Sequence, residues 1–98
     1  MKAAIDKGPT SIAVRAGYNG FSAYAGGVFD GAGCPSGVDH AVTAVGYGTD
    51  SATGKDYWLV RNSWGEYWGE GGYIRMEVVD GSGVCQCQSS PSVIESLN

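Results

Sequence analysis

Glycine is the feature that most constrains what this sequence can fold into, because 17 of its 98 residues are glycine. Average usage is about 7%, and glycine concentrates in tight turns and where two backbones approach closely. Short apolar segments, several of them rich in β-branched residues, lie between the glycines. The sequence therefore predicts a turn-rich β architecture.

Four segments have the apolar and β-branched pattern typical of strands: residues 10–16, 38–47, 57–62 and 72–79. The polar residues 48–56 predict a long hairpin loop between the second and third of these strands. Residues 26–37 predict another loop, in which Val28 and Phe29 form an extended anchor. The strands are short and the connections between them are rich in turn residues.

Two short helices and an irregular tail complete the prediction. Residues 1–7 read as the end of a truncated helix, which Gly8 and Pro9 stop. Residues 18–24 place aromatic side chains at helical spacing, as expected for packing against a core. From residue 81 to residue 98 the chain is rich in glycine, serine and glutamine and predicts an irregular tail.

These elements predict a mainly β fold with short helices, of the α+β class. Short strands separated by turns favour an antiparallel twisted sheet or a partly closed β-barrel. No composition shift or linker divides the sequence, so we expect residues 1–98 to form one domain.

Charge and hydropathy exclude several classes of partner. Six basic residues against ten acidic ones give a net charge of -4, which argues against nucleic acid and anionic membrane surfaces. No apolar run approaches the roughly 18 to 20 residues of a membrane span, and the N-terminus has no hydrophobic signal region. We therefore expect neither a nucleic-acid nor a membrane partner.

His40 is the only histidine and follows Asp39 at the start of a predicted strand. Imidazole is the side chain best suited to exchanging protons near neutral pH. A lone histidine on a strand is, however, more often a packed structural group than a catalytic base. His40 becomes a candidate base only with a second observation.

That observation is a resemblance to the papain-like cysteine proteases of the papain and cathepsin type. The segment Asn62-Ser63-Trp64-Gly65, followed by Trp68-Gly69-Glu70 and Gly72-Tyr73-Ile74-Arg75, resembles the asparagine motif of that family. Asp39-His40-Ala41-Val42, ending in Val45-Gly46-Tyr47-Gly48, resembles its histidine motif. The resemblance covers residues 1 to about 94, and it implies the right-hand, C-terminal half of a papain-like fold.

The resemblance implies a role for each candidate site residue. His40 would act as catalytic base and acid, and Asn62 would orient its ring. Trp64 would cover the bond between them and exclude water, with Asp39 in a supporting position. Val38 and Ala41 would border the substrate cleft, and Ser90 would lie at the bottom of a substrate pocket. The alternative reading of Trp58 and Trp68 is ordinary aromatic core packing.

The three cysteines have separate expectations. Cys34 and Cys85 resemble the half-cystines that bridge this domain in the family, and Cys87 reads as a small buried hydrophobe. Together with His40 they would supply the three cysteines and one histidine of a zinc site, but their spacing along the chain is poor for such a site. Gly69-Glu70-Gly71-Gly72 lacks the lysine of a phosphate loop. We expect no metal and no cofactor.

The family's nucleophile motif decides the expected function. In papain and its relatives that cysteine lies roughly 130 to 150 residues before the histidine and asparagine, whereas 39 residues precede His40 here. We expect a processed light chain or truncated form, inactive alone, whose partners are an N-terminal half with the catalytic cysteine, a peptide or protein substrate and cystatin-like inhibitors. The resemblance implies a lysosomal, vacuolar or extracellular location. The alternative is a non-catalytic peptide- or partner-binding domain of the same fold.

Overall fold

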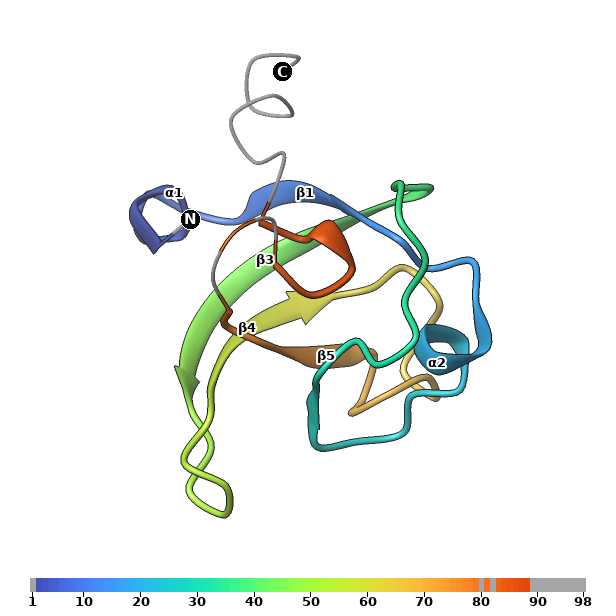
Figure 1. Ribbon diagram of the computed structural model, residues 1–98. Coiled ribbons are helices and arrows are strands. Elements are labelled where there is room, and N and C mark those ends of the chain that lie inside the picture. The colour runs from blue at the N-terminus through green and yellow to red at the C-terminus, as the bar shows by residue number, and fades with distance from the viewer. Residues whose placement is uncertain (1, 80, 82, 89–98) are drawn as a thin grey trace.

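The computed structural model describes residues 2–79, 81 and 83–88. Within this part of the chain the elements follow the order α1 (Lys2–Asp6), β1 (Thr10–Val14), α2 (Asn19–Ser22), β2 (Val28–Phe29), β3 (His40–Thr49), β4 (Asp56–Arg61), β5 (Tyr73–Glu77) and the 3-10 turn η1 (Val84–Gln86). Figure 1 shows the strands in the middle of the molecule, with α1 and α2 on opposite sides of them. The expected mainly β fold with short helices is confirmed.

The strands form one five-stranded sheet in the order β1-β3-β4-β5-β2. The β1–β3, β3–β4 and β4–β5 pairs are antiparallel, whereas β2 pairs parallel with β5. The sheet is therefore mixed, and β1 and β2 remain as its two edges, so it does not close into a barrel. Parallel β2 is only two residues long, which leaves no alternation from which its direction could be predicted.

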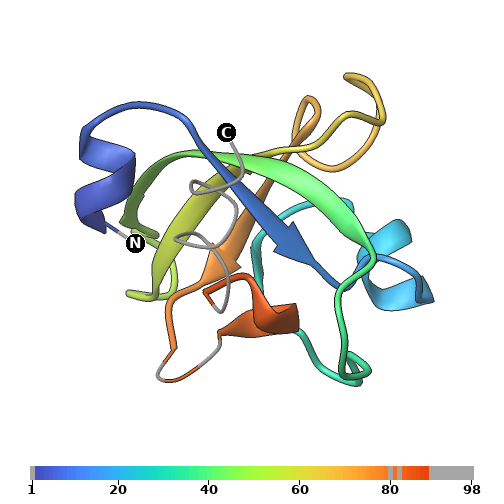
Figure 2. The same ribbon diagram turned by 90° about the horizontal axis from the view of Figure 1, so that it is seen from above.

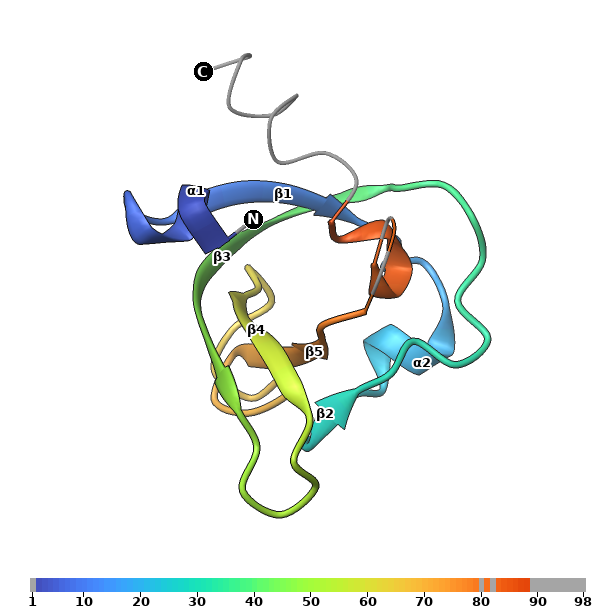
Figure 3. The ribbon, with the colours of Figure 1, turned by 60° about the vertical axis from the view of Figure 1, so that its left-hand side comes forward.

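Strand β3 bends the sheet into a curve. Its pairing with β4 shifts register between Ala44 and Gly46, so Val45 is an extra residue that forms a β-bulge. Figure 3 shows the resulting curvature, with β3 arching over β4. The strand runs on to Thr49, so the hairpin loop is shorter than the expected 48–56.

The core lies on one face of this curved sheet. Alternate residues of the strands are buried there, as the period of two requires, and the helical turns and the tail add further side chains: Ile12, Val14, Val42, Ala44, Trp58, Val60, Ile74 and Met76 from the sheet, with Phe21, Tyr24, Val84, Cys85 and Cys87. Figure 2, seen from above, shows α2 and η1 at the ends of the strands.

The tail is more ordered at its start than the sequence suggested. Val84–Gln86 form a 3-10 turn in which Cys85 and Gln86 have positive φ angles of 48° and 64°, an uncommon conformation for residues with a side chain. The Arg15 N–H donates to the Cys85 carbonyl over 3.0 Å, which ties this turn to the end of β1. Ser90 lies outside the described residues. No helix in the described part of the chain has the length and apolar content needed to cross a bilayer.

Candidate active site

His40 is the first residue of β3 and is held by the neighbouring strand β1. It pairs with Val14 of β1, and the preceding Asp39 N–H donates to the Val14 carbonyl over 3.0 Å. The imidazole itself is half-buried. The strand ladder thus fixes the backbone of His40 while part of its ring remains accessible.

Asn62 follows directly after β4, whose last residue Arg61 pairs with Thr43 of β3. Its backbone N–H donates to the Gly72 carbonyl over 3.0 Å, and its side chain is buried, with the residue only 7% exposed. The Asn62 Oδ1 lies 2.7 Å from the His40 Nε2. Two residues 22 positions apart are therefore joined by a short hydrogen bond between neighbouring strand ends.

This bond determines which ring nitrogen carries a proton. The same Asn62 Oδ1 accepts from the Ser63 backbone N–H over 2.7 Å, and a backbone N–H can only donate, which assigns oxygen to that position. The His40 Nε2 must therefore be the donor to Asn62. In the neutral imidazole Nδ1 is then the unprotonated nitrogen, and among the described residues no group hydrogen-bonds to it. Nδ1 is the atom able to accept a proton.

Trp64 packs against His40. Its ring stacks on the His40 ring with a centroid distance of 5.1 Å and an interplanar angle of 26°. Phe21 packs edge-on against Trp64 at 5.6 Å, and Trp68 does so at 5.3 Å. Trp64 itself is 42% exposed. The Trp64 ring thus lies directly against the imidazole of the candidate pair.

Trp58 and Trp68 differ in their surroundings. Trp58 is 4% exposed in the core, and its Nε1 donates to the Gln88 Oε1 over 3.0 Å. Trp68 stacks on Phe21 at 5.2 Å and donates from Nε1 to the Ser22 carbonyl over 3.1 Å. Trp68 therefore contacts Trp64 in addition to its packing against the core.

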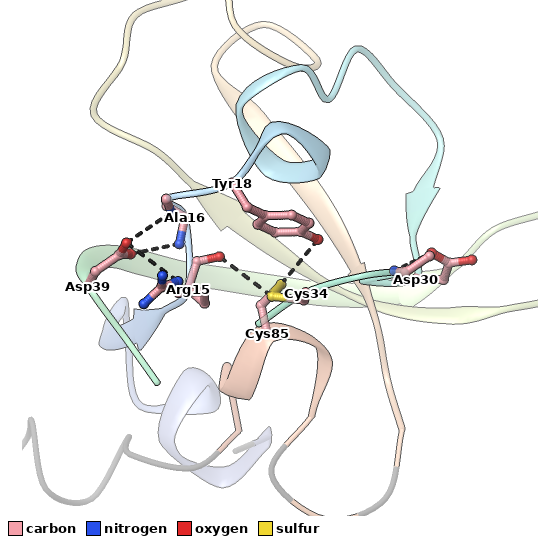
Figure 4. Close-up of a disulfide and its surroundings, with 9 residues drawn as sticks. Arg15, Ala16, Tyr18, Asp30, Cys34, Asp39 and Cys85 are labelled. Carbon is pink, nitrogen blue, oxygen red and sulfur yellow. Dashed lines mark hydrogen bonds and ion pairs between the residues drawn. A yellow bond between two sulfur atoms is a disulfide. The ribbon is translucent and has the colours of Figure 1, made fainter. Parts of the chain in front are cut away.

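Asp39 contacts the backbone that follows β1. Its carboxylate accepts from the Ala16 N–H over 2.7 Å and from the Gly17 N–H over 2.9 Å, and Arg15 Nε lies 3.8 Å away. Figure 4 shows these three interactions converging on one carboxylate. The Ala16 hydrogen bond first, then the Gly17 bond and the Arg15 charge, lower the pKa of Asp39. Asp39 thus fixes the turn that leads into His40.

Two of the remaining candidates for the substrate cleft, Val38 and Ala41, lie near the start of β3. Val38 is 45% exposed and Ala41 is also exposed, pairing with Ala13 of β1. Ser90, the third of these candidates, lies outside the described residues. Val38 thus lies in the loop just before β3 and Ala41 lies on β3 itself, one on each side of His40 along the chain.

All three cysteines lie in the described part of the chain, and none presents a thiol at the surface. Cys34 and Cys85 form a disulfide with a Cα–Cα distance of 5.7 Å, beside the Tyr18 hydroxyl (Figure 4). Cys87 is free but fully buried. Burial raises the pKa of the Cys87 thiol to about 12. Within the described residues no group of three or more metal-ligating side chains gathers at one point.

Comparison with known proteins agrees with this geometry. The profile of the Papain family cysteine protease matches residues 1–94. The chain belongs to the papain family of cysteine proteases. Cysteine proteinase RD21A of Arabidopsis thaliana is 50% identical over 94 residues, which are 94% of this chain and 20% of that protein. Cysteine protease 1 of Oryza sativa subsp. japonica is 56% identical over 77 residues, 79% of this chain and 16% of that protein.

A solved structure shows the same relationship in three dimensions. The bromelain protease from Ananas comosus in complex with the E64 inhibitor matches with a TM-score of 0.81 and 51% identity, over 90% of this chain and 40% of that one. The chain thus spans well under half the length of the papain-family proteins it matches. It corresponds to a partial domain, a C-terminal fragment of a papain-like protease.

Two features of the site were not found from the sequence. The Asp39 contact with the Ala16 and Gly17 backbone joins groups 23 and 22 residues apart, and backbone donors leave no trace in a sequence. The second is an ion cluster of Arg75 with Glu70 and Asp50 beneath the loop that follows Asn62. Its only sequence signal is the alternation of charged residues with glycines near β5.

Proposed function

We propose that this chain supplies the histidine and asparagine of a papain-like thiol protease site, and that the nucleophilic cysteine comes from a companion half. The observation that carries the proposal is the 2.7 Å hydrogen bond between His40 Nε2 and Asn62 Oδ1 beneath the Trp64 ring. That bond directs the unprotonated Nδ1 away from Asn62, where a thiol of the companion half can meet it. The base and its orienting group are then present before the nucleophile arrives.

The chemistry follows from this arrangement. His40 Nδ1 takes the proton of the companion's thiol and leaves a thiolate beside an imidazolium. The thiolate attacks the peptide carbonyl carbon, and Nδ1–H then protonates the leaving amine as the C–N bond breaks and a thioester forms. Water, losing a proton to Nδ1, hydrolyses the thioester to the acid and restores the thiol. Asn62 holds the ring through both proton transfers.

Alone, the chain lacks the reactive thiol that this cycle needs. Cys34 and Cys85 are joined to each other, and Cys87 is buried with its pKa raised to about 12. At neutral pH a thiol with that pKa is protonated and is a poor nucleophile. We therefore expect no peptide-bond hydrolysis by the isolated chain.

The finer assignments belong to the same proposal. Val38, Ala41 and Ser90 would contact the side chain of a peptide or protein substrate, and cystatin-like inhibitors would bind only the assembled cleft. The Cys34–Cys85 disulfide favours an oxidising compartment, in agreement with a vacuolar, lysosomal or extracellular site of action. No cofactor takes part in this mechanism.

The test is complementation. The chain is refolded with the N-terminal half of the bromelain protease, one relative of known structure, and turnover of a fluorogenic peptide is measured. We expect activity that appears only in the mixture, and His40→Ala lowers kcat by about 10² to 10⁴-fold. Tyr67→Ala is the matched control, because Tyr67 lies in the loop after Asn62 but is 96% exposed. Equal activity of the mixture with and without the His40 imidazole contradicts the proposal.

The alternative is a non-catalytic domain that binds peptides or a partner. The exposure of the apolar side chains Val38 (45%) and Trp64 (42%) around the candidate site favours it. The complementation experiment separates the two functions. A stable complex of the two halves that binds peptide but releases no product supports the binding domain.

A further inference from the structure

Arg75 lies within the sheet, on the strand next to its β2 edge and 13 residues after Asn62. It lies on β5, paired with Leu59 of β4 on one side and with Val28 of β2 on the other. Its side chain is 22% exposed. A guanidinium presents five donors in a rigid plane, and here three of them bind carboxylates in two loops, one before β4 and one after it.

The first of these contacts is bidentate. Arg75 Nε donates to the Glu70 Oε1 over 2.7 Å and Nη2 donates to the Glu70 Oε2 over 2.9 Å. Such paired charge-assisted bonds are the strongest and most directional ones that arginine makes. Glu70 belongs to the segment 62–72, which begins with Asn62 and also carries Trp64 and Trp68. Glu70 Oε2 further accepts from the Gly27 N–H over 3.1 Å, so the same carboxylate also holds the turn before β2.

The second contact ties in the β3–β4 hairpin. Arg75 Nη1 donates to the Asp50 Oδ1 over 2.7 Å. Asp50 Oδ2 in turn accepts from the Thr53 N–H over 3.0 Å and from its hydroxyl over 2.8 Å. We call Arg75, Glu70 and Asp50 the Arg75 cluster. In it, each of the three guanidinium nitrogens of Arg75 donates a hydrogen bond to a carboxylate oxygen. The hydrogen bonds from Arg75 lower the pKa of Glu70, and those from Thr53 and then Arg75 lower that of Asp50, so the cluster stays ionised.

The segment 62–72 is folded so that a shift at Glu70 reaches Asn62. Gly72 N–H donates to the Trp68 carbonyl over 2.8 Å, and the Gly72 carbonyl accepts from the Asn62 N–H over 3.0 Å. A Cβ placed on Gly72 would lie 3.2 Å from the Gly65 carbonyl oxygen, which shows how closely the two arms of the loop approach. A displacement of Glu70 can therefore be passed to Asn62 through the backbone hydrogen bonds of Gly72.

We infer that Arg75 is a positioning residue for the candidate active site: by holding Glu70 it sets the loop that places the Asn62 amide against His40 beneath Trp64. The inference deepens the proposed function, and its test by enzyme activity rests on that function. Its test by the geometry of the site does not, because the His40–Asn62 bond lies entirely within this chain. Positioning groups of this kind are commonly worth one to two orders of magnitude in rate, since small displacements of a catalytic group are costly.

The test by geometry is made on the chain by NMR, through exchange of the His40 Nε2 proton with water. Arg75→Lys keeps the charge but loses the planar fork, and we expect it to speed this exchange about tenfold. The backbone amide of Val60 in the core is the internal reference, because general destabilisation would speed both exchanges together. Glu70→Gln is the second variant, should Arg75→Lys fold poorly. Lys55→Met is the matched control. It removes a surface ion pair of 3.9 Å between Lys55 and Glu77, and Glu77 lies on β5 as Arg75 does.

The test by enzyme activity uses the two-half protease. Arg75→Lys should lower kcat about tenfold and leave KM within about twofold, while Lys55→Met changes neither. An unchanged ratio of His40 to Val60 exchange in both Arg75→Lys and Glu70→Gln overturns the inference, whatever the protease does. Faster His40 exchange with an inactive wild-type mixture would support the positioning role and count against the proposed function alone.

Discussion

Removal of the Cys34–Cys85 disulfide should cost this domain a large part of its stability. The two cysteines are 51 residues apart, and closing a loop of that length restricts the unfolded chain by about 4 kcal/mol in the chain-entropy relation. The total free energy of unfolding of a domain of this size is roughly 5 to 15 kcal/mol. The bond also anchors the segment that leads from Cys34 to His40, so its loss should loosen the approach to the site.

The assay is urea unfolding at pH 7, followed by tryptophan fluorescence. The Cys34→Ala/Cys85→Ala chain should lose about 4 kcal/mol of unfolding free energy, and the wild-type chain in reducing buffer should lose a similar amount. The reduced wild-type chain is the control for side-chain packing, because it keeps every atom of both cysteines except the bond. A loss below about 1 kcal/mol in both cases would refute the reasoning.

Three further predictions concern single side chains. Cys87, with its pKa raised to about 12 by burial, should react with a soluble disulfide reagent at pH 8 at least about a thousandfold more slowly than in the urea-unfolded chain, and equal rates would exclude a buried thiol. Asp39 has a lowered pKa, so its folded value lies below its unfolded one; its contribution to stability is complete above about pH 4 and is lost as the pH falls through the folded pKa. Asp39→Asn should therefore flatten the acid side of the stability curve measured by urea titration, and an unchanged curve would be evidence against the Ala16 bond. Ile74→Ala, at a side chain that is 0% exposed, should cost about 2 to 5 kcal/mol in urea unfolding, and a loss under about 1 kcal/mol would contradict the described core.

Local sequence patterns predicted most of the fold. The strand positions follow from short apolar runs between glycines, and Gly8-Pro9 ends the first helix where expected. The parallel pairing of Val28 and Phe29 with β5 could not be predicted, because two residues carry no period. The 3-10 turn at Val84 was also missed, since it requires positive φ angles at Cys85 and Gln86 that depend on contacts with distant Arg15.

The candidate site was predictable to a different extent. His40 alone was ambiguous, and the resemblance of its surroundings to a family motif, together with Asn62, made the pair a hypothesis; their 2.7 Å separation agrees with it. The functional roles of both residues remain predictions. The Arg75 cluster escaped sequence reasoning because its members are 5 and 25 residues apart, and ion pairs across loops have no local pattern.

The central claim, that His40 is the base for a thiol on a companion half, is tested most directly by the reactivity of that thiol. The rate of its alkylation by iodoacetamide is measured at pH 6 in the two-half complex, with wild-type chain and with His40→Ala. An imidazolium partner keeps the sulfur as a thiolate well below the usual pKa of about 8.5. The account predicts rapid alkylation with the wild-type chain and a loss of about a hundredfold with His40→Ala. Equal rates with the two chains would contradict it.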